Sequence, residues 1–94
     1  MSLSKGKKNE EEMLLEKLKC ISDKSKYEIL KMLNTEPMYG QQIAQKLNLT
    51  TATISYHMNS LSLNKLVSIN KIDNKAYYSI NKEAINEICN LLKT

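Results

Sequence analysis

The sequence predicts a mainly α-helical domain with one small β-hairpin, in the order helix, helix, helix, helix, strand, strand, helix. Apolar residues recur at helical spacing over four consecutive stretches and once more near the C-terminus. Between residues 67 and 80 the pattern changes to alternation with period two, interrupted by a two-residue turn. The length of 94 residues suits one domain, and no segment is repeated or of low complexity.

Residues 1–9 are polar and basic, which predicts a disordered tail or linker, and the domain is placed at residues 10–94. Met1-Ser2-Leu3 resembles an expression scar, so the chain can be one part of a longer protein. There is no Phe and no Trp, so aliphatic side chains, Met and Tyr must fill the core. A domain this small buries a limited fraction of its surface, which favours a dimer. No apolar run approaches the roughly 18 residues of a membrane span, so a soluble chain is expected.

The first helix is predicted over residues 10–21, where three leading glutamates suit the positive end of a helix dipole. Its apolar stripe at spacing i, i+4 and i+7 consists of Leu14, Leu18 and Ile21. The second helix is predicted over residues 24–33, capped by Asp23 or Ser25. Its inward-facing set is expected to comprise Tyr27, Leu30 and Leu33, with Ile29 and Met32 alongside. Asn34 in a left-handed conformation is expected to end it.

A third helix is predicted over residues 40–47, followed by a turn at Asn48, which tolerates a positive φ angle. The small residue Ala44, four positions before that turn residue, is typical of a tight helix-turn-helix. The buried side of this helix is expected to comprise Ile43, Ala44 and Leu47, with Leu49 packed beneath the turn. The next segment is therefore expected to be the second helix of the motif.

The stretch from Thr50 to Leu61 is the helix around which the rest of the chain is organised. Its apolar stripe consists of Ile54, Met58 and Leu61, and either Thr50 or Thr51 can cap its first turn. The other faces carry hydroxyl, amide, phenol and imidazole groups and no acidic side chain. Short hydroxyl and amide groups can reach base edges in a major groove. An ordinary amphipathic helix with a polar surface is the alternative.

Residues 67–71 and 76–80 can both alternate with period two, and Asp73-Asn74 between them tolerates left-handed backbone. This predicts a β-hairpin with Tyr78 and Ile80 on one face and with Lys71 and Lys75 at its tip. Asn81 is expected to cap a last helix that ends at residue 92. The residues on one face of this helix are Ile85, Ile88, Cys89 and Leu92. The complete order is that of a winged helix-turn-helix.

The positive charge of the chain is concentrated in its middle. Residues 38–82 carry five lysines and one aspartate, a net charge of +4, whereas the charges of the segments before and after cancel each other. A localised basic region is typical of a protein that binds a polyanion such as DNA. All the basic residues are lysines, which contact phosphate as point charges.

From residue 12 to residue 92 the sequence resembles the ArsR/SmtB-like bacterial repressors. ISDKSKYEILKML is similar to the family's second helix, LNLTTATISYHMNSL to its turn and recognition helix, and LVSINKIDNKAYYSI to its wing. The spacing of Ser55, His57-Met58 and Leu61 is the most specific part. The resemblance implies a homodimer that binds an operator through two recognition helices, with repression relieved by a signal, often a metal. It also implies a dimer interface made by the first and last helices, through Leu14, Leu18, Ile85, Ile88 and Leu92.

The metal sites of the family do not carry over to this chain. Arsenic- and cadmium-sensing members hold paired cysteines where this chain has Met38-Tyr39-Gly40-Gln41-Gln42. Zinc-sensing members place Asp and His on the last helix, and residues 81–92 contain neither. A tight transition-metal site needs three or four convergent ligands, so no metal and no cofactor are expected. A site shared across a dimer by Cys20, Cys89 and carboxylates is the alternative.

The candidate DNA-binding residues follow from the recognition helix and the wing. For base reading the candidates are Thr51, Thr53, Tyr56 and Asn59. For phosphate contact they are Thr50, Ser55 and Lys65, with Lys71 and Lys75 meeting the minor groove or the backbone. His57 is expected to orient the helix by a hydrogen bond or to meet phosphate. For the base-reading residues the alternative is plain solvent exposure, and for the two wing lysines it is a solvated turn.

Cys20 and Cys89 lack the paired spacing of a disulfide framework, which fits a reducing cytoplasm. They are interpreted either as a redox-sensitive pair or, more simply, as two small buried hydrophobic residues.

The favoured interpretation is a cytoplasmic, dimeric, sequence-specific repressor that binds double-stranded DNA at an inverted repeat. The alternatives are a winged-helix module that binds protein, and the DNA-binding fragment of a larger sensor. An enzyme is not expected, because there is no nucleophile–base set and only two glycines could serve a phosphate loop. The inducer stays open between a small molecule, a redox signal and none.

Overall fold

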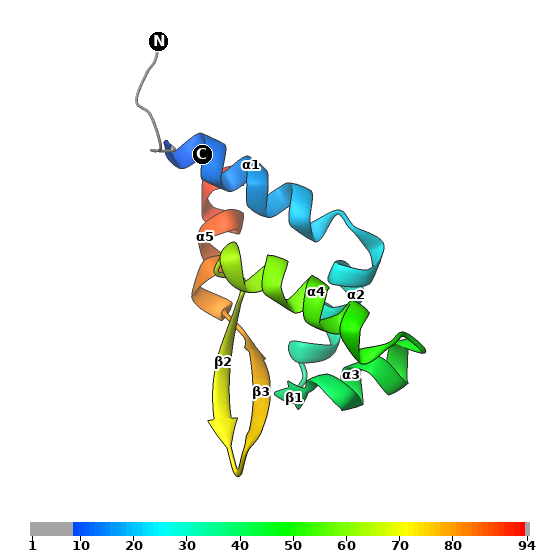
Figure 1. Ribbon diagram of the computed structural model, residues 1–94. Coiled ribbons are helices and arrows are strands. Elements are labelled where there is room, and N and C mark those ends of the chain that lie inside the picture. Colours follow the sequence, from blue (N-terminus) through cyan, green and yellow to red (C-terminus); the bar gives the residue numbers. More distant parts are fainter. Residues whose placement is uncertain (1–8, 94) are drawn as a thin grey trace.

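The computed structural model describes residues 9–93, and within them the predicted winged helix-turn-helix is confirmed (Figure 1). Five helices and three strands follow one another in this part of the chain: α1 (Glu10–Ile21), α2 (Lys24–Leu33), β1 (Met38–Tyr39), α3 (Gly40–Leu47), α4 (Thr51–Leu63), β2 (Val67–Ile72), β3 (Lys75–Ile80) and α5 (Lys82–Lys93). The helical bounds of α1, α2 and α3 are those that the sequence predicts. The predicted tail at residues 1–8 lies outside the described residues.

Asn9, which the sequence places in that tail, is the N-cap of α1. Its side-chain oxygen accepts a hydrogen bond of 2.7 Å from the backbone N–H of Glu12. The Glu12 carboxylate in turn accepts one of 3.1 Å from the N–H of Asn9. This reciprocal capping box satisfies two backbone donors that a helix start otherwise leaves unpaired. Asn9 therefore belongs to the capped start of α1, directly before its first helical residue.

The core is aliphatic and lies where α2, α3 and α4 meet the base of the sheet. Its completely buried large side chains are Ile29, Ile43, Ile54, Met58, Leu61 and Leu66. Within α2 the buried set is Ile29, Leu30 and Leu33. Tyr27, predicted to face inward, is 48% exposed because the buried stripe of this helix is centred on the other side of Leu30.

Asn34 was expected in a left-handed conformation at the end of α2, and this expectation is wrong. Its φ angle is −64°, and its N–H donates to the carbonyl of Leu30. The next residue, Thr35, donates to the carbonyl of Met32 at 3.1 Å, so the helix tightens into a turn of the i to i−3 kind. The carbonyls of Leu30 and Met32 are thus satisfied without a left-handed residue.

The predicted hairpin is confirmed, but it belongs to a sheet of three strands in the order β1-β3-β2. Asp73 and Asn74 both have positive φ angles, as a tight hairpin turn between twisted strands requires. Strand β1 was not predicted, since two residues are too short to show any periodicity. Its pairing places Tyr39 directly opposite Tyr77.

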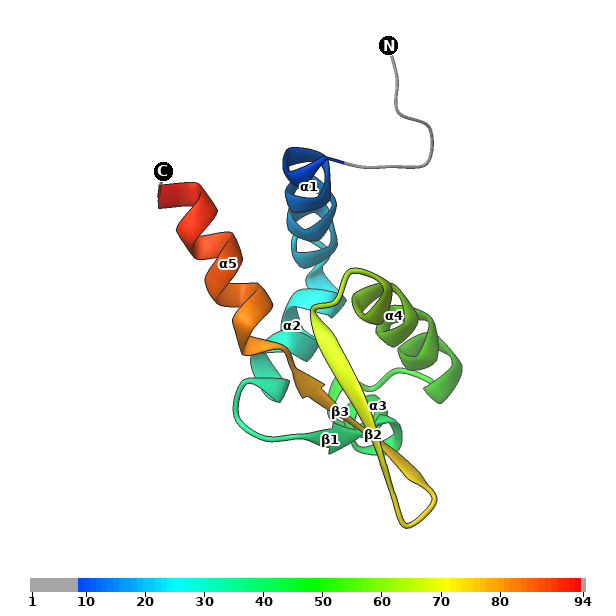
Figure 2. The same cartoon turned by 90° about the vertical axis from the view of Figure 1, so that its left-hand side faces the viewer.

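Helix α5 begins as expected, because the side chain of Asn81 accepts a hydrogen bond from the N–H of Ala84. Its buried residues are Ala84 and Ile88, whereas Cys89 and Leu92 are exposed in the single chain. Within the single chain, the apolar face that the sequence predicts is therefore covered only in the N-terminal half of α5. Figure 2 shows that the C-terminal half extends away from the sheet, toward the end of the domain where α1 begins and opposite the wing tip. Among the described residues no helix combines the length and apolar character of a membrane span.

Candidate nucleic-acid interface

The turn between α3 and α4 is as tight as the sequence predicts. Asn48 has a φ angle of 56° and a ψ angle of 45°, which is left-handed backbone. The N–H of Leu49 donates to the carbonyl of Ala44 at 3.0 Å and so closes the end of α3. Leu49 packs against the core. This geometry fixes the direction in which α4 leaves the turn and so determines which of its faces meets solvent.

Thr50 caps α4. Its hydroxyl oxygen accepts a hydrogen bond of 3.1 Å from the N–H of Thr53 and lies 2.9 Å from the hydroxyl oxygen of Thr53, to which it donates. Thr53 is half-buried, so this predicted base-reading residue lies at the side of the exposed face. Of the two caps that the sequence allowed, only Thr50 has this role, and Thr51 is the first helical residue.

The outward face of α4 is uncharged. The buried stripe is Ile54, Met58 and Leu61, as predicted. The exposed residues between positions 51 and 59 are Thr51, Ala52, Ser55, Tyr56 and Asn59, and Tyr56 is 69% exposed. Ala52 was missed because it carries no polar group, yet its spacing to Tyr56 at i+4 and Asn59 at i+7 could have revealed it. This face offers hydroxyl, amide and methyl groups to a partner.

His57 lies beside this face and is half-buried. Its Nδ1 atom is buried and has no hydrogen-bond partner among the described residues. Its ring makes an edge contact with Tyr56 at 5.6 Å between centroids. The Nδ1 atom of His57 therefore does not make the expected hydrogen bond. Within α4, the contact of its ring is the one with Tyr56.

The two lysines near the tip of the wing differ in their surroundings. Lys71 is exposed on β2, opposite Ala76. The Nζ atom of Lys75 lies 4.5 Å from the centroid of the Tyr39 ring, which in turn makes an edge contact with Tyr77 at 5.5 Å. Sequence reasoning left the role of Tyr39 open. In the structure this tyrosine joins the wing to the start of α3.

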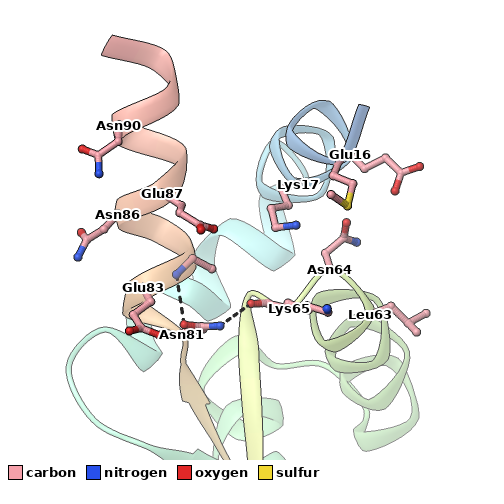
Figure 3. Close-up of a pocket in the computed structure, with 12 residues that line it drawn as sticks. Glu16, Lys17, Leu63, Asn64, Lys65, Asn81, Glu83, Asn86, Glu87 and Asn90 are labelled. Atoms are coloured by element: carbon pink, nitrogen blue, oxygen red, sulfur yellow. Dashed lines mark hydrogen bonds between the residues drawn. The ribbon is translucent and has the colours of Figure 1, made fainter. Parts of the chain in front are cut away.

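Lys65 is separated from the other candidates. It follows the C-terminal end of α4, with a φ angle of 60°, and its carbonyl accepts a hydrogen bond of 2.9 Å from the Asn81 side chain. Figure 3 shows it at the mouth of an open cavity between α1, α4 and α5, whose lining includes Lys17 and Glu87. The helix rises about 1.5 Å per residue, so Lys65 lies roughly 20 Å from Thr50.

The two cysteines are in different environments. Cys20 is buried in the core, and its Sγ atom lies 3.7 Å from the Ser60 hydroxyl oxygen on α4. Cys89 is exposed on α5. The interpretation as a small buried residue is therefore right for Cys20 and wrong for Cys89. Within residues 9–93, no three His, Cys, Asp or Glu side chains are grouped so that they could hold a metal ion.

A tight helix-turn-helix with an uncharged, polar outward face, followed by a wing that carries lysines, defines a winged helix-turn-helix DNA-binding protein. Residues 23–68 match the model of a family of regulators described as bacterial regulatory protein, arsR family. The chain belongs to this arsR family. It is therefore a DNA-binding transcriptional regulator and not an enzyme.

Similar proteins agree with this assignment. The arsenical resistance operon repressor of Staphylococcus aureus is 34% identical over 71 residues, which cover 76% of this chain and 68% of the relative. The structure of an ArsR-like transcriptional regulator from Rhodococcus sp. RHA1 has a TM-score of 0.82 at 23% identity, covering 88% of this chain and 78% of that one. A homodimeric winged helix-turn-helix domain from Mycobacterium bovis has a TM-score of 0.76 at 16% identity, covering 95% and 87%. The two structures show the fold.

Proposed function

We propose that this regulator is a dimeric repressor that reads an inverted-repeat operator with α4 and contacts the flanking DNA with its wing. The observation that carries the proposal is the exposed, uncharged face of α4. A helix that faced only water would usually carry charges there, whereas α4 presents hydroxyl, amide and methyl groups. Such groups match the hydrogen-bond and methyl pattern of A·T pairs in the major groove.

We assign each candidate residue to base contact or to phosphate contact by its position on α4 or on the wing. Thr51, Tyr56 and Asn59 stand on the exposed face and are proposed to meet base edges, with Ala52 added to them. Ser55 and the N-terminal end of α4 are proposed to meet phosphate, since the first backbone N–H groups of a helix favour an anion. The remaining candidates have weaker positions in the structure: Thr50 and Thr53 are bonded to each other, His57 is half-buried, and Lys65 lies at the far end.

Lys71 and Lys75 are proposed to contact the DNA backbone from the wing. Each phosphate neutralised by a lysine releases counterions, so affinity should fall as salt rises. Lys75 lies over the Tyr39 ring, whereas Lys71 is exposed without that contact. Lys71 is therefore the better candidate to move toward a phosphate group and contact it.

A dimer is supported by apolar surface that α1 and α5 leave uncovered. Leu92 is 63% exposed, and Met13 and Leu15 on α1 are exposed as well. Both helices lie at the end of the domain opposite the wing tip in both views (Figures 1 and 2). Of the five predicted interface residues, Ile88 belongs to the core of its own chain, and Leu14, Leu18 and Ile85 pack against that core. We therefore centre the proposed interface on Leu92 and on Met13, which lies on the side of α1 nearest α5.

The signal that relieves repression is not transferred from the Staphylococcus aureus relative, whose name concerns arsenical resistance. Cys20 is buried against α4 and Cys89 is exposed on α5, while the start of α3 contains Tyr39, Gly40 and Gln41. These positions do not support a paired-thiol site for arsenic at the start of α3. A small molecule, a redox signal or constitutive binding all fit the chain.

The test is selection of binding sites from random double-stranded DNA at two salt concentrations. The proposal expects an enriched inverted repeat with half-sites centred about 34–36 Å apart, because two recognition helices of a dimer meet successive major grooves. Asn59→Ala should flatten the preference at one base pair in each half-site. Lys71→Ala should weaken binding to all sequences alike and reduce the salt dependence. A wild-type chain that enriches no motif and binds no DNA at low salt would favour the protein-interaction module instead.

A further inference from the structure

Lys26 is a basic residue at an inward-facing position of α2. It stands at i, with Ile29, Leu30 and Leu33 at i+3, i+4 and i+7, and these three are buried. Its side chain is only 12% exposed, whereas Lys24 on the same helix is exposed. An ammonium group removed from water in this way needs partners, because burying an unpaired charge is costly.

Lys26 has two partners: Asp23 at the start of α2, and Tyr56 on α4. Its Nζ atom lies 3.9 Å from a carboxylate oxygen of Asp23, which also caps α2 by accepting the backbone N–H of Lys26. On the other side it lies 5.6 Å from the centroid of the Tyr56 ring on α4. This distance is within the range in which a cation is attracted to an aromatic face. Lys26 therefore connects the capped start of α2 to the DNA-facing helix.

The Tyr56 ring has two neighbours within the chain but stays largely exposed to solvent. Lys26 contacts it from α2, and the His57 ring meets it at 5.6 Å with an angle of 61° between the ring planes. Yet the residue is 69% exposed. An exposed tyrosine without neighbours would sample several rotamers and would lose that freedom on binding. Two contacts restrict the ring before any partner arrives.

We propose that Lys26 is a positioning residue for DNA recognition, which holds the Tyr56 ring in the orientation that meets a thymine methyl group in the major groove. Apolar side-chain surface recognises that methyl group, and Ala52 lies one turn before Tyr56 on the same face. The inference rests on the proposed function, since it assigns a role within the same DNA interface. Because its Nζ atom lies 3.9 Å from an Asp23 carboxylate oxygen and 5.6 Å from the centroid of the Tyr56 ring, Lys26 acts through the tyrosine and not as a phosphate contact.

The experiment compares four chains on the operator that wild type selects: wild type, Lys26→Met, Tyr56→Ala and the double variant. Methionine keeps an apolar stem for packing and removes the charge. Lys26→Met should lower affinity about two- to fivefold, the strength of an exposed cation–π contact. It should flatten the base preference at the same position as Tyr56→Ala and leave the salt dependence unchanged. In the Tyr56→Ala background, Lys26→Met should have no further effect. Lys26→Arg should restore binding, since arginine also stacks on an aromatic face.

Lys24→Met is the matched control, because Lys24 is an exposed lysine on the same helix. If Lys26→Met costs the same with and without Tyr56, and the salt slope falls by about one, Lys26 is a phosphate contact and the proposal is wrong. If wild type selects no motif at all, the proposed function itself fails. That result differs from a failure of the Lys26 proposal, in which wild type still selects a motif.

A measurement on the free wild-type protein tests the contact even if Lys26→Met does not fold. The ring should shift the NMR signals of the Lys26 Cε protons upfield, and Tyr56→Leu should return them to ordinary values. Unshifted signals in wild type, or signals that Tyr56→Leu leaves in place, would contradict the proposal.

Discussion

The ammonium group of Lys75 lies over the ring of Tyr39, with its Nζ atom 4.5 Å from the ring centroid. Tyr39 is paired with Tyr77 across β1 and β3, and it is also the N-cap residue of α3, where its N–H donates to the Gln42 side chain at 3.0 Å. One side chain thus connects the wing with the first helix of the helix-turn-helix. The two parts that are proposed to contact DNA are held in one relative position by this contact.

Tyr39→Leu should therefore weaken operator binding, because it removes the cation–π contact that holds the wing. We expect a loss of about two- to fivefold in affinity, measured by titration of a labelled operator. Tyr39→Phe is the control, since it keeps the aromatic face and should bind like wild type. Equal losses in the two variants would show that the hydroxyl group, and not the face of the ring, matters.

Leu61→Ala should destabilise the domain by about 2–5 kcal/mol, because Leu61 is completely buried and its truncation leaves a cavity. The measurement is urea unfolding followed by circular dichroism, at one protein concentration for all variants. Leu63→Ala on the same helix is the control: that residue is 76% exposed, and the change should stay within about 0.5 kcal/mol. A similar cost for both would contradict the orientation of α4.

Thr50→Ala should reduce stability by about 0.5–2 kcal/mol, because it removes the oxygen that accepts the N–H of Thr53 at the start of α4. The same unfolding assay measures it. Thr51→Ala serves for comparison, since Thr51 is the exposed first residue of the helix and not its cap. The cap assignment fails if Thr51→Ala proves the more damaging change.

Leu92→Lys should weaken the proposed dimer. Burying a leucine stabilises an interface by about 1.5–3 kcal/mol, so the dissociation constant should rise by about tenfold to 150-fold for each of the two copies. Sedimentation equilibrium measures this constant directly. Ile72→Lys is the control, since Ile72 is exposed at the end of β2 on the wing, and the wing tip lies at the opposite end of the domain from α1 and α5 (Figures 1 and 2). Dimerisation that Leu92→Lys leaves intact would place the interface elsewhere.

Sequence reasoning predicted the elements of this domain well where the signal is local. The caps Asp23, Thr50 and Asn81, the left-handed Asn48 and the buried stripe of α4 are all as expected. Each depends on residues within about two helical turns of one another, or on the backbone preference of a single residue. These local signals alone were enough to identify the exposed face of α4 as a candidate recognition surface.

Two of the wrong expectations share one cause. Tyr27 on α2 and Cys89 on α5 both lie at helical spacing from buried residues, yet both are exposed. Periodicity identifies an apolar face, but it cannot tell how wide the covering surface is or where it ends along the helix. Tyr27 falls beyond the edge of the core, and the end of α5 extends past it.

The sequence by itself determined the helix-turn-helix, the hairpin and the uncharged face of α4, because caps, turns and periodicity act between near neighbours in the chain. Only the tertiary structure decided which distant side chains meet. Lys26 reaches Tyr56 from another helix, and Lys75 reaches Tyr39 from another strand. Such contacts depend on how α2, α4 and the sheet are placed around the shared core, and no local preference of either residue encodes that placement.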